Sequence, residues 1–194
     1  GIAVNEEGVP TAEDLTSSVT IHIGDYVAAI EKAVANATDL GASATDTLGL
    51  GVVTTIAKSA DAGEEDGVAQ AYSMYTATTF AADGKITSSV IDASQTNVNF
   101  DATGKITSDL AAEYKTKNEL GAEYGMVKAS TIGKEWNEQA AAYAAYVTGK
   151  TIDEVKGIAV NEEGVPTAED LVSSVTIHTG DFIKILEKAT AIAK

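Results

Sequence analysis

The chain contains no cysteine and no arginine, and these two absences exclude several kinds of functional site. Without cysteine there are no disulfides, iron–sulfur clusters, thiolate metal sites or cysteine nucleophiles. Without arginine the chain lacks the usual bidentate clamp for a free phosphate or carboxylate. A phosphate-bearing cofactor therefore needs another means of attachment.

Positive charge is scarce, because 13 lysines face 29 acidic residues and the net charge is −16. Binding to nucleic acid requires clustered Lys and Arg, and so does adhesion to an anionic membrane surface, so the charge argues against both partners. No run approaches the roughly 20 apolar residues of a membrane helix. A Walker loop, a GxGxxG fingerprint and a Ser-His-Asp order are also missing. The apolar content of 44% nevertheless supports a packed core.

An internal repeat is the most informative feature that is present. Residues 157–194 repeat residues 1–38, and 28 of the 38 aligned positions are identical. The only histidines (His22, His178) occupy equivalent positions in the two copies. A fixed offset of this size indicates a duplicated domain. We expect residues 1–38 to be the C-terminal tail of a preceding repeat, 39–48 a linker and 49–194 a complete domain.

The middle of the chain is predicted to form β-strands. Tyr72, Met74 and Thr76 alternate with residues of the opposite face, and the Asp83-Gly84 pair is typical of a hairpin turn. An earlier strand is expected around residues 49–56, with Val52, Val53 and Ile56 in the core.

Helices are predicted at both ends of this strand region. Amphipathic stripes begin at Gly24 and at Gly180, and a helix from Thr131 places an apolar stripe on one face, formed by Ile132, Trp136, Ala140, Tyr143 and Val147. Thr151 and Glu154 have capping-box spacing. Strands followed by helices indicate the α+β class, with an antiparallel sheet and helices packed on it.

A polar motif precedes the last predicted helix. It reads Asp170-Leu171-Val172-Ser173-Ser174-Val175-Thr176, and its twin spans residues 14–20. A helix N-terminus stabilises a phosphate without arginine, because its N–H groups are unpaired and its dipole is positive there. The hydroxyl groups of Ser173, Ser174 and Thr176 add hydrogen-bond donors. The hydroxyl of Thr176 is also a candidate for covalent attachment of a phosphate as a phosphoester. Taken alone, the pattern favours an ordinary capping segment.

The motif resembles the flavinylation motif Asp-x-x-Ser-[Gly/Ser]-Ala-Thr of the FMN-binding domains of the RnfG/NqrC type. The closer resemblance is to the PplA-type Gram-positive surface flavoproteins of extracellular electron transfer, and residues 124–158 are also similar to that type. The matching residues are Asp170, Ser173, Ser174 and Thr176 in one copy, and Asp14, Ser17, Ser18 and Thr20 in the other. The chain departs from the motif at two positions. Val175 and Val19 replace the usual alanine, and valine is larger and more restricted at χ1. Ser174 and Ser18 stand where glycine is commoner.

This resemblance implies an FMN-binding-domain type of fold and FMN joined through its phosphate to Thr176, with Thr20 in the corresponding position of the neighbouring domain. It implies a redox carrier rather than an enzyme, modified by a separate flavin transferase. The implied partners are a membrane quinol dehydrogenase or other electron donor and extracellular acceptors. The implied location is the extracellular face of the membrane, with a lipid anchor in an upstream segment.

Several further residues are candidates for a flavin pocket, each with an ordinary structural alternative. Trp136 is either core or an aromatic wall against the flavin ring, and Tyr124, Met126 and Ser130 either line the pocket or pack a loop. His178 lies two residues after the motif threonine, where a surface position at a helix end is the simpler interpretation. Metal ligation by the histidines is not expected, since no acidic partner has ligand spacing.

Two other functions remain open from the sequence. A structural or adhesive surface repeat without cofactor suits the repeat, the acidity and the missing cysteine. A flavin module of a larger reductase is the third interpretation.

Overall fold

The computed structural model describes residues 1–193 and forms two compact units, Gly1–Asp39 and a second unit that begins at Leu40. The first unit holds a loop closed by a bridge between Val4 and Pro10, followed by helix α1 (Gly24–Ala35). The predicted helix is confirmed, but it buries none of its residues. The apolar side chains of Tyr26, Ile30 and Val34 are exposed.

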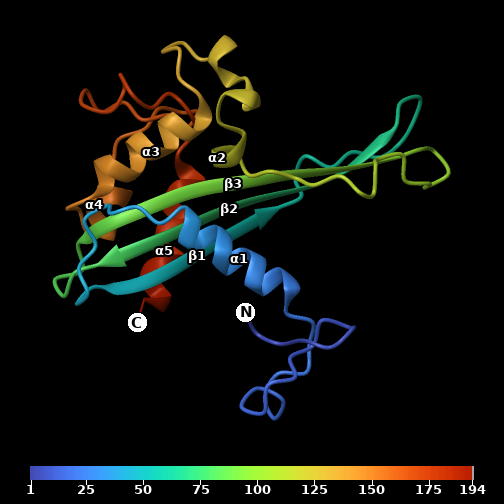
Figure 1. Cartoon of the computed structure of the whole chain (residues 1–194). Helices are drawn as coiled ribbons and strands as arrows, with labels where there is room; N and C mark the ends of the chain where they lie inside the picture. The colour runs from blue at the N-terminus through green and yellow to red at the C-terminus, as the bar shows by residue number, and fades with distance from the viewer. Residues whose placement is uncertain (194) are drawn as a thin grey trace. The chain divides into compact units, whose positions relative to one another are not determined.

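The second unit contains a three-stranded antiparallel sheet in the order β1-β2-β3 (Figure 1), formed by β1 (Thr47–Thr55), β2 (Gly67–Phe80) and β3 (Ile86–Phe100). The hairpin predicted at Asp83-Gly84 joins β2 to β3, and Gly84 has the positive φ that such a turn favours. The predicted combination of an antiparallel sheet with helices packed on it is confirmed.

Side chains of β2 alternate between the two faces of the sheet, as predicted. Met74, Thr76 and Thr78 are buried under the helices, while Ala77 on the opposite face is exposed. The hydroxyl groups of Thr76 and Thr78 both lie within hydrogen-bond distance of the Ser89 hydroxyl on β3, at 3.1 and 3.0 Å. These buried polar groups therefore satisfy one another.

Strand β1 lies unusually close to helix α5 (Gly180–Ile192), and glycine makes this possible. A Cβ atom at Gly51 would lie 1.8 Å from the carbonyl oxygen of Ile185, and one at Gly49 would lie 2.0 Å from that of Ala189. The expected core role of β1 was therefore wrong in part. Val53 packs against the core, but Val52 and Ile56 are exposed, because the buried face of this strand is largely glycine.

The remaining helices of the second unit are short, except for α3. They are α2 (Lys117–Leu120), the 3₁₀ segments η1 (Gly121–Tyr124) and η2 (Met126–Lys128), α3 (Trp136–Val147) and α4 (Ile152–Lys156). The capping box at the start of α4 is confirmed. Helix α3 begins at Trp136 rather than Thr131, because Gly133 has a positive φ and Glu135 caps the helix; Ile132 therefore lies outside it.

The core lies between the sheet and helices α3 and α5. The predicted stripe of α3 from Trp136 to Val147 is buried, and Phe182 of α5 contacts the rings of Trp136 and Tyr143 at centroid distances of 5.8 and 5.3 Å. Such aromatic contacts add to the stability that burial provides. Within residues 1–193, no helix is both long and apolar enough to cross a membrane.

Candidate functional site

The motif before α5 folds as a compact turn held by two buried apolar residues. Leu171 and Val175 are almost completely buried, and the N–H of Val175 donates to the carbonyl of Leu171 at 2.9 Å. Val175, which stands where the resembled motif has alanine, is thus a core residue. Ser174 donates its hydroxyl to the carbonyl of Leu171, while Ser173 is exposed.

Thr176 is held by the buried amide of Gln139 on α3. Its N–H donates to Oε1 of Gln139 at 2.8 Å, and its hydroxyl donates to the same oxygen at 3.3 Å. The Gln139 amide is oriented in turn, because its Nε2 donates to the Ser130 hydroxyl and to the Lys134 carbonyl. The half-buried Thr176 hydroxyl therefore has a defined direction, with its proton toward Gln139.

Asp170, the first residue of the motif, faces α3 as well. Its Oδ1 accepts a hydrogen bond from the hydroxyl of Tyr146 at 3.1 Å. Burial and this carboxylate raise the pKa of Tyr146. Asp170 therefore anchors the turn to α3 through Tyr146, whereas Thr176 is held by a different residue of that helix, Gln139.

Helix α5 begins four residues after Thr176. Thr179 is buried at the N-cap, and Asp181 in the first turn forms an ion pair with Lys184 at 2.8 Å. Because a carboxylate already occupies this positive end of the helix, the first turn gives a phosphate less support than the sequence led us to expect. The His178 ring lies against Gly180 at the start of the helix and against Gly164, which belongs to a loop closed by a bridge between Val160 and Pro166.

A cavity of about 390 Å³ lies beside the motif, lined by the two residues that follow Thr176, Ile177 and His178. Its other lining residues come from the sheet, the turn after β1, α2, η1, α3 and α5, and include Thr55, Lys58, Gln70, Tyr72, Met74, Gln95, Lys117, Tyr124, Trp136 and Asp181. Two of the predicted pocket residues, Trp136 and Tyr124, are thus brought to one cavity near the motif. Its volume falls in the usual range of small-molecule sites.

Lys117 lies among the aromatic rings of this cavity and is 95% buried, with 5% of its surface exposed. Its Nζ lies 4.8 Å from the ring centroid of Tyr72, 4.5 Å from that of Tyr124 and 4.9 Å from that of Trp136. Burial lowers the pKa of Lys117 to about 8; Lys58 adds to this effect and Asp92 opposes it. Burial also raises the pKa of Tyr72 and of Tyr124.

Met126 lies next to this cavity rather than in it. It lines a neighbouring hollow that shares Lys117, Tyr124 and Gln95 with the first. Buried Glu135 fixes this segment, because its carboxylate accepts hydrogen bonds from the N–H groups of Met126 and Val127 at 2.8 and 3.1 Å. Ser130 supports Gln139 and does not line the cavity.

The first copy of the motif has the same turn without the same surroundings. Val19 donates its N–H to Leu15, as Val175 does to Leu171, so the local fold repeats. Asp14, Ser17, Ser18 and Thr20 are all exposed. Among residues 1–39, no glutamine is present to hold Thr20 as Gln139 holds Thr176.

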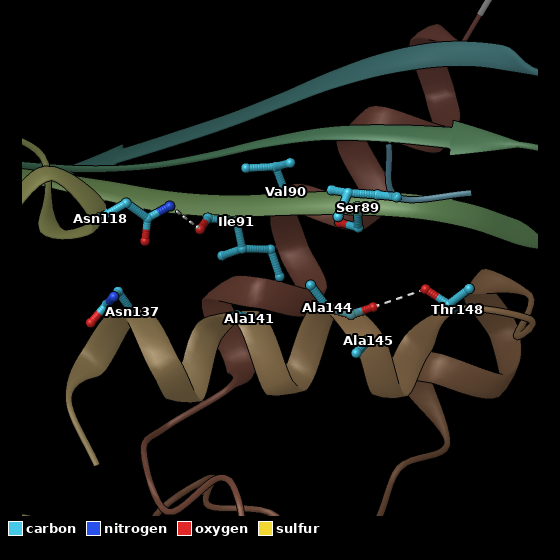
Figure 2. A pocket seen from close by; sticks show the side chains of 10 residues that line it. Ser89, Val90, Ile91, Asn118, Asn137, Ala141, Ala144, Ala145 and Thr148 are labelled. Atoms are coloured by element: carbon cyan, nitrogen blue, oxygen red, sulfur yellow. Dashed lines mark hydrogen bonds between the residues drawn. The ribbon is translucent and has the colours of Figure 1, made fainter. Parts of the chain in front are cut away.

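A larger hollow of about 530 Å³ lies elsewhere, between β3 and α3 (Figure 2). Figure 2 shows α3 lying along β3, with Ala144 toward the strand and with Asn118 bonded to the carbonyl of Ile91; Ala141 and Ala145 also line the hollow. Its lining includes no ionisable side chain and no motif residue. It provides apolar space but no group for chemistry, so the smaller aromatic cavity is the stronger candidate.

Sequence reasoning missed Lys117, Tyr72 and Gln139. A capping box at Thr116 and Glu119 was the available signal for a helix that starts at Lys117. For Gln139 the signal was a polar residue on the apolar stripe of α3, one turn after Trp136. No group of three or more metal-ligating side chains occurs in the part of the chain that the structure describes.

Comparisons with family models, with curated proteins and with solved structures find no match for this chain. The interpretation of the site therefore depends on the motif, the cavity and their chemistry.

Proposed function

We propose that the unit beginning at Leu40 is an FMN-binding domain that carries FMN on Thr176 through a phosphoester, and that it acts as a redox carrier. The observation that carries this proposal is one juxtaposition. The motif threonine has a directed hydroxyl, and the next two residues line a cavity with three aromatic side chains. A flat apolar ring system is the ligand that such a cavity favours.

The donor set fits FMN in two respects. Trp136, Tyr72 and Tyr124 offer aromatic surface to the flavin ring, and Lys117 offers a cation to its polar edge. The phosphate has no arginine to bind it, and Asp181 occupies the nearby helix end. Covalent attachment supplies the retention that electrostatics cannot.

The attachment is a phosphoryl transfer to Thr176. An Oγ–P bond forms, the bond from phosphorus to the leaving phosphate of an activated flavin donor breaks, and the hydroxyl proton passes to a base of the transferase. The proposed partner is therefore a flavin transferase. Bound FMN supplies the electron transfer, while the chain tethers and orients it.

A covalent cofactor is most useful where a diffusible flavin would be lost. This supports a place on the extracellular face of a membrane, between a quinol dehydrogenase or other donor and an extracellular acceptor. We propose one loaded site in residues 1–194, because Thr20 is exposed and lacks the tertiary partner that Thr176 has.

The test is co-expression of the chain with a flavin transferase, followed by intact mass and in-gel flavin fluorescence after denaturation. Wild type and Thr20→Val should gain one FMN, and Thr176→Val should gain none. The matched pair separates the two copies of one motif. An unmodified wild type beside a control domain that is labelled would refute the proposal and favour the cofactor-free surface repeat.

A further inference from the structure

Lys117 carries a buried positive charge without a matching negative one. Among the described residues, none of the ion pairs includes its ammonium group. Asp92 is close enough to influence it, but Oδ1 of Asp92 accepts from the N–H groups of Asn118 and Ala93. A buried charge costs free energy unless it is paired. An unpaired lysine at this position is therefore a candidate for binding a ligand.

The ammonium group also has hydrogen-bonding capacity to spare. It donates to the Tyr72 hydroxyl at 3.2 Å, which is the one acceptor assigned to it among residues 1–193. A lysine ammonium has three donors, so two remain for a ligand. The aromatic rings around it provide cation–π stabilisation when no ligand is bound.

The ligand that meets these features is planar, apolar on its faces and electron-rich along one edge. A flavin ring fits, because its pyrimidine edge carries N1 and the C2 oxygen as acceptors. Uptake of two electrons and one proton leaves the ring with a proton at N5 and negative charge at N1 and this oxygen. A fixed cation at that edge stabilises the reduced ring more than the oxidised ring.

Building on the proposed function, we infer that Lys117 contacts the pyrimidine edge of the flavin ring and raises its reduction potential. The other charges at the cavity do not take this role. Lys58 lines the cavity but is exposed, so its charge is screened by water, and Asp181 is negative and already paired with Lys184.

The first experiment compares the loaded wild-type chain with the loaded Lys117→Met variant, which keeps the approximate length of the side chain and its apolar stem but removes the ammonium charge. FMN content by absorbance and mass is measured first, and then the midpoint potential is measured with dithionite as reductant. We expect both proteins to contain the same amount of FMN. In Lys117→Met the equilibrium constant for reduction of the flavin should be at least tenfold lower, so its midpoint potential should fall by about 30 mV or more for a two-electron couple. Lys117→Arg keeps the charge and should restore most of the potential.

Lys105→Met is the matched control, since it removes one lysine charge at an exposed position that lines neither this cavity nor the neighbouring hollow. Its potential should stay close to that of wild type. Equal potentials for wild type and Lys117→Met at equal FMN content would overturn the inference. A fall of the same size in Lys105→Met would also overturn it, because the loss of any lysine charge would then have the effect.

A second experiment separates this inference from the proposed covalent function. Riboflavin, which has no phosphate, is added to the unloaded chain. The affinities of the chain for oxidised and for reduced riboflavin are then compared by anaerobic equilibrium dialysis. Tenfold weaker binding of reduced riboflavin by Lys117→Met, with little change for oxidised riboflavin, supports Lys117 even if Thr176 is never modified. No riboflavin binding by a folded wild type would overturn the inference.

Discussion

Gln139 provides a direct test of whether the domain orients Thr176 for the proposed modification. The amide oxygen of Gln139 accepts both the N–H and the hydroxyl of Thr176, at 2.8 and 3.3 Å. We expect Gln139→Met to fill nearly the same volume and to remove this acceptor. The hydroxyl of Thr176 should then rotate freely, and modification by the transferase should slow.

The stability cost can be worked from the bonds that are lost. The N–H of Thr176 loses its partner, and an unsatisfied buried polar group costs about 1–3 kcal/mol. The longer hydroxyl bond adds less, because the half-buried Thr176 can turn toward water. We therefore expect a loss of about 2 kcal/mol in the free energy of unfolding, which lowers Tm by about 4–8 °C in a domain of this size.

Urea denaturation and the initial rate of FMN incorporation are the two measurements. Asn137→Leu controls for loss of an amide on the same helix, since the side-chain oxygen of Asn137 is buried without a hydrogen-bond partner in the described structure. Val147→Ala, at the other end of α3, provides a variant of similar instability whose change is far from the motif along the helix. Equal incorporation rates in Gln139→Met and Val147→Ala would show that Gln139 contributes stability alone.

Two further predictions concern packing and pH. Gly51→Ala should destabilise the chain by about 3 kcal/mol or more in urea denaturation. Its Cβ atom would lie 1.8 Å from the Ile185 carbonyl oxygen, so α5 would have to move. Gly63→Ala is the control, because a Cβ atom there has no neighbour within 4 Å, and it should change the stability by less than about 1 kcal/mol. Burial lowers the pKa of Lys117 from 10.5 to about 8. Between these pH values Lys117 binds more protons in the unfolded chain than in the folded chain. Its contribution to the free energy of unfolding therefore increases as the pH rises from 8 to 10.5. The rise should disappear in Lys117→Met, and a rise that persists unchanged would contradict the assignment.

Local patterns predicted the elements of the second unit well, because they depend on neighbours along the chain. The alternation in β2, the turn at Gly84 and the buried stripe from Trp136 to Val147 each follow from a periodicity or a turn preference. The exposure of Val52 did not follow, because the approach of α5 to the glycine face of β1 is a tertiary contact.

The same distinction applies to the candidate site. The sequence supplied Thr176 from a short motif and Trp136 as one of two open interpretations. It did not supply Tyr72 or Lys117, because these come from a strand and a one-turn helix that meet only in the folded domain. A lysine in a polar segment is usually solvent-exposed, and burial of this one depends on three rings from distant positions.

The two copies of the motif separate what the motif does locally from what the domain adds. Both form the same turn, since the N–H groups of Val19 and Val175 make equivalent hydrogen bonds. Within residues 1–193, the second copy contacts Gln139 of α3 and is followed by a helix that buries Phe182 in the core, whereas the helix after the first copy buries no residue. If Thr176 carries FMN as proposed, its hydroxyl is a defined acceptor because Gln139 orients it. Thr20, which is exposed and has no glutamine among residues 1–39 to hold it, should then stay unmodified while Thr176 is labelled.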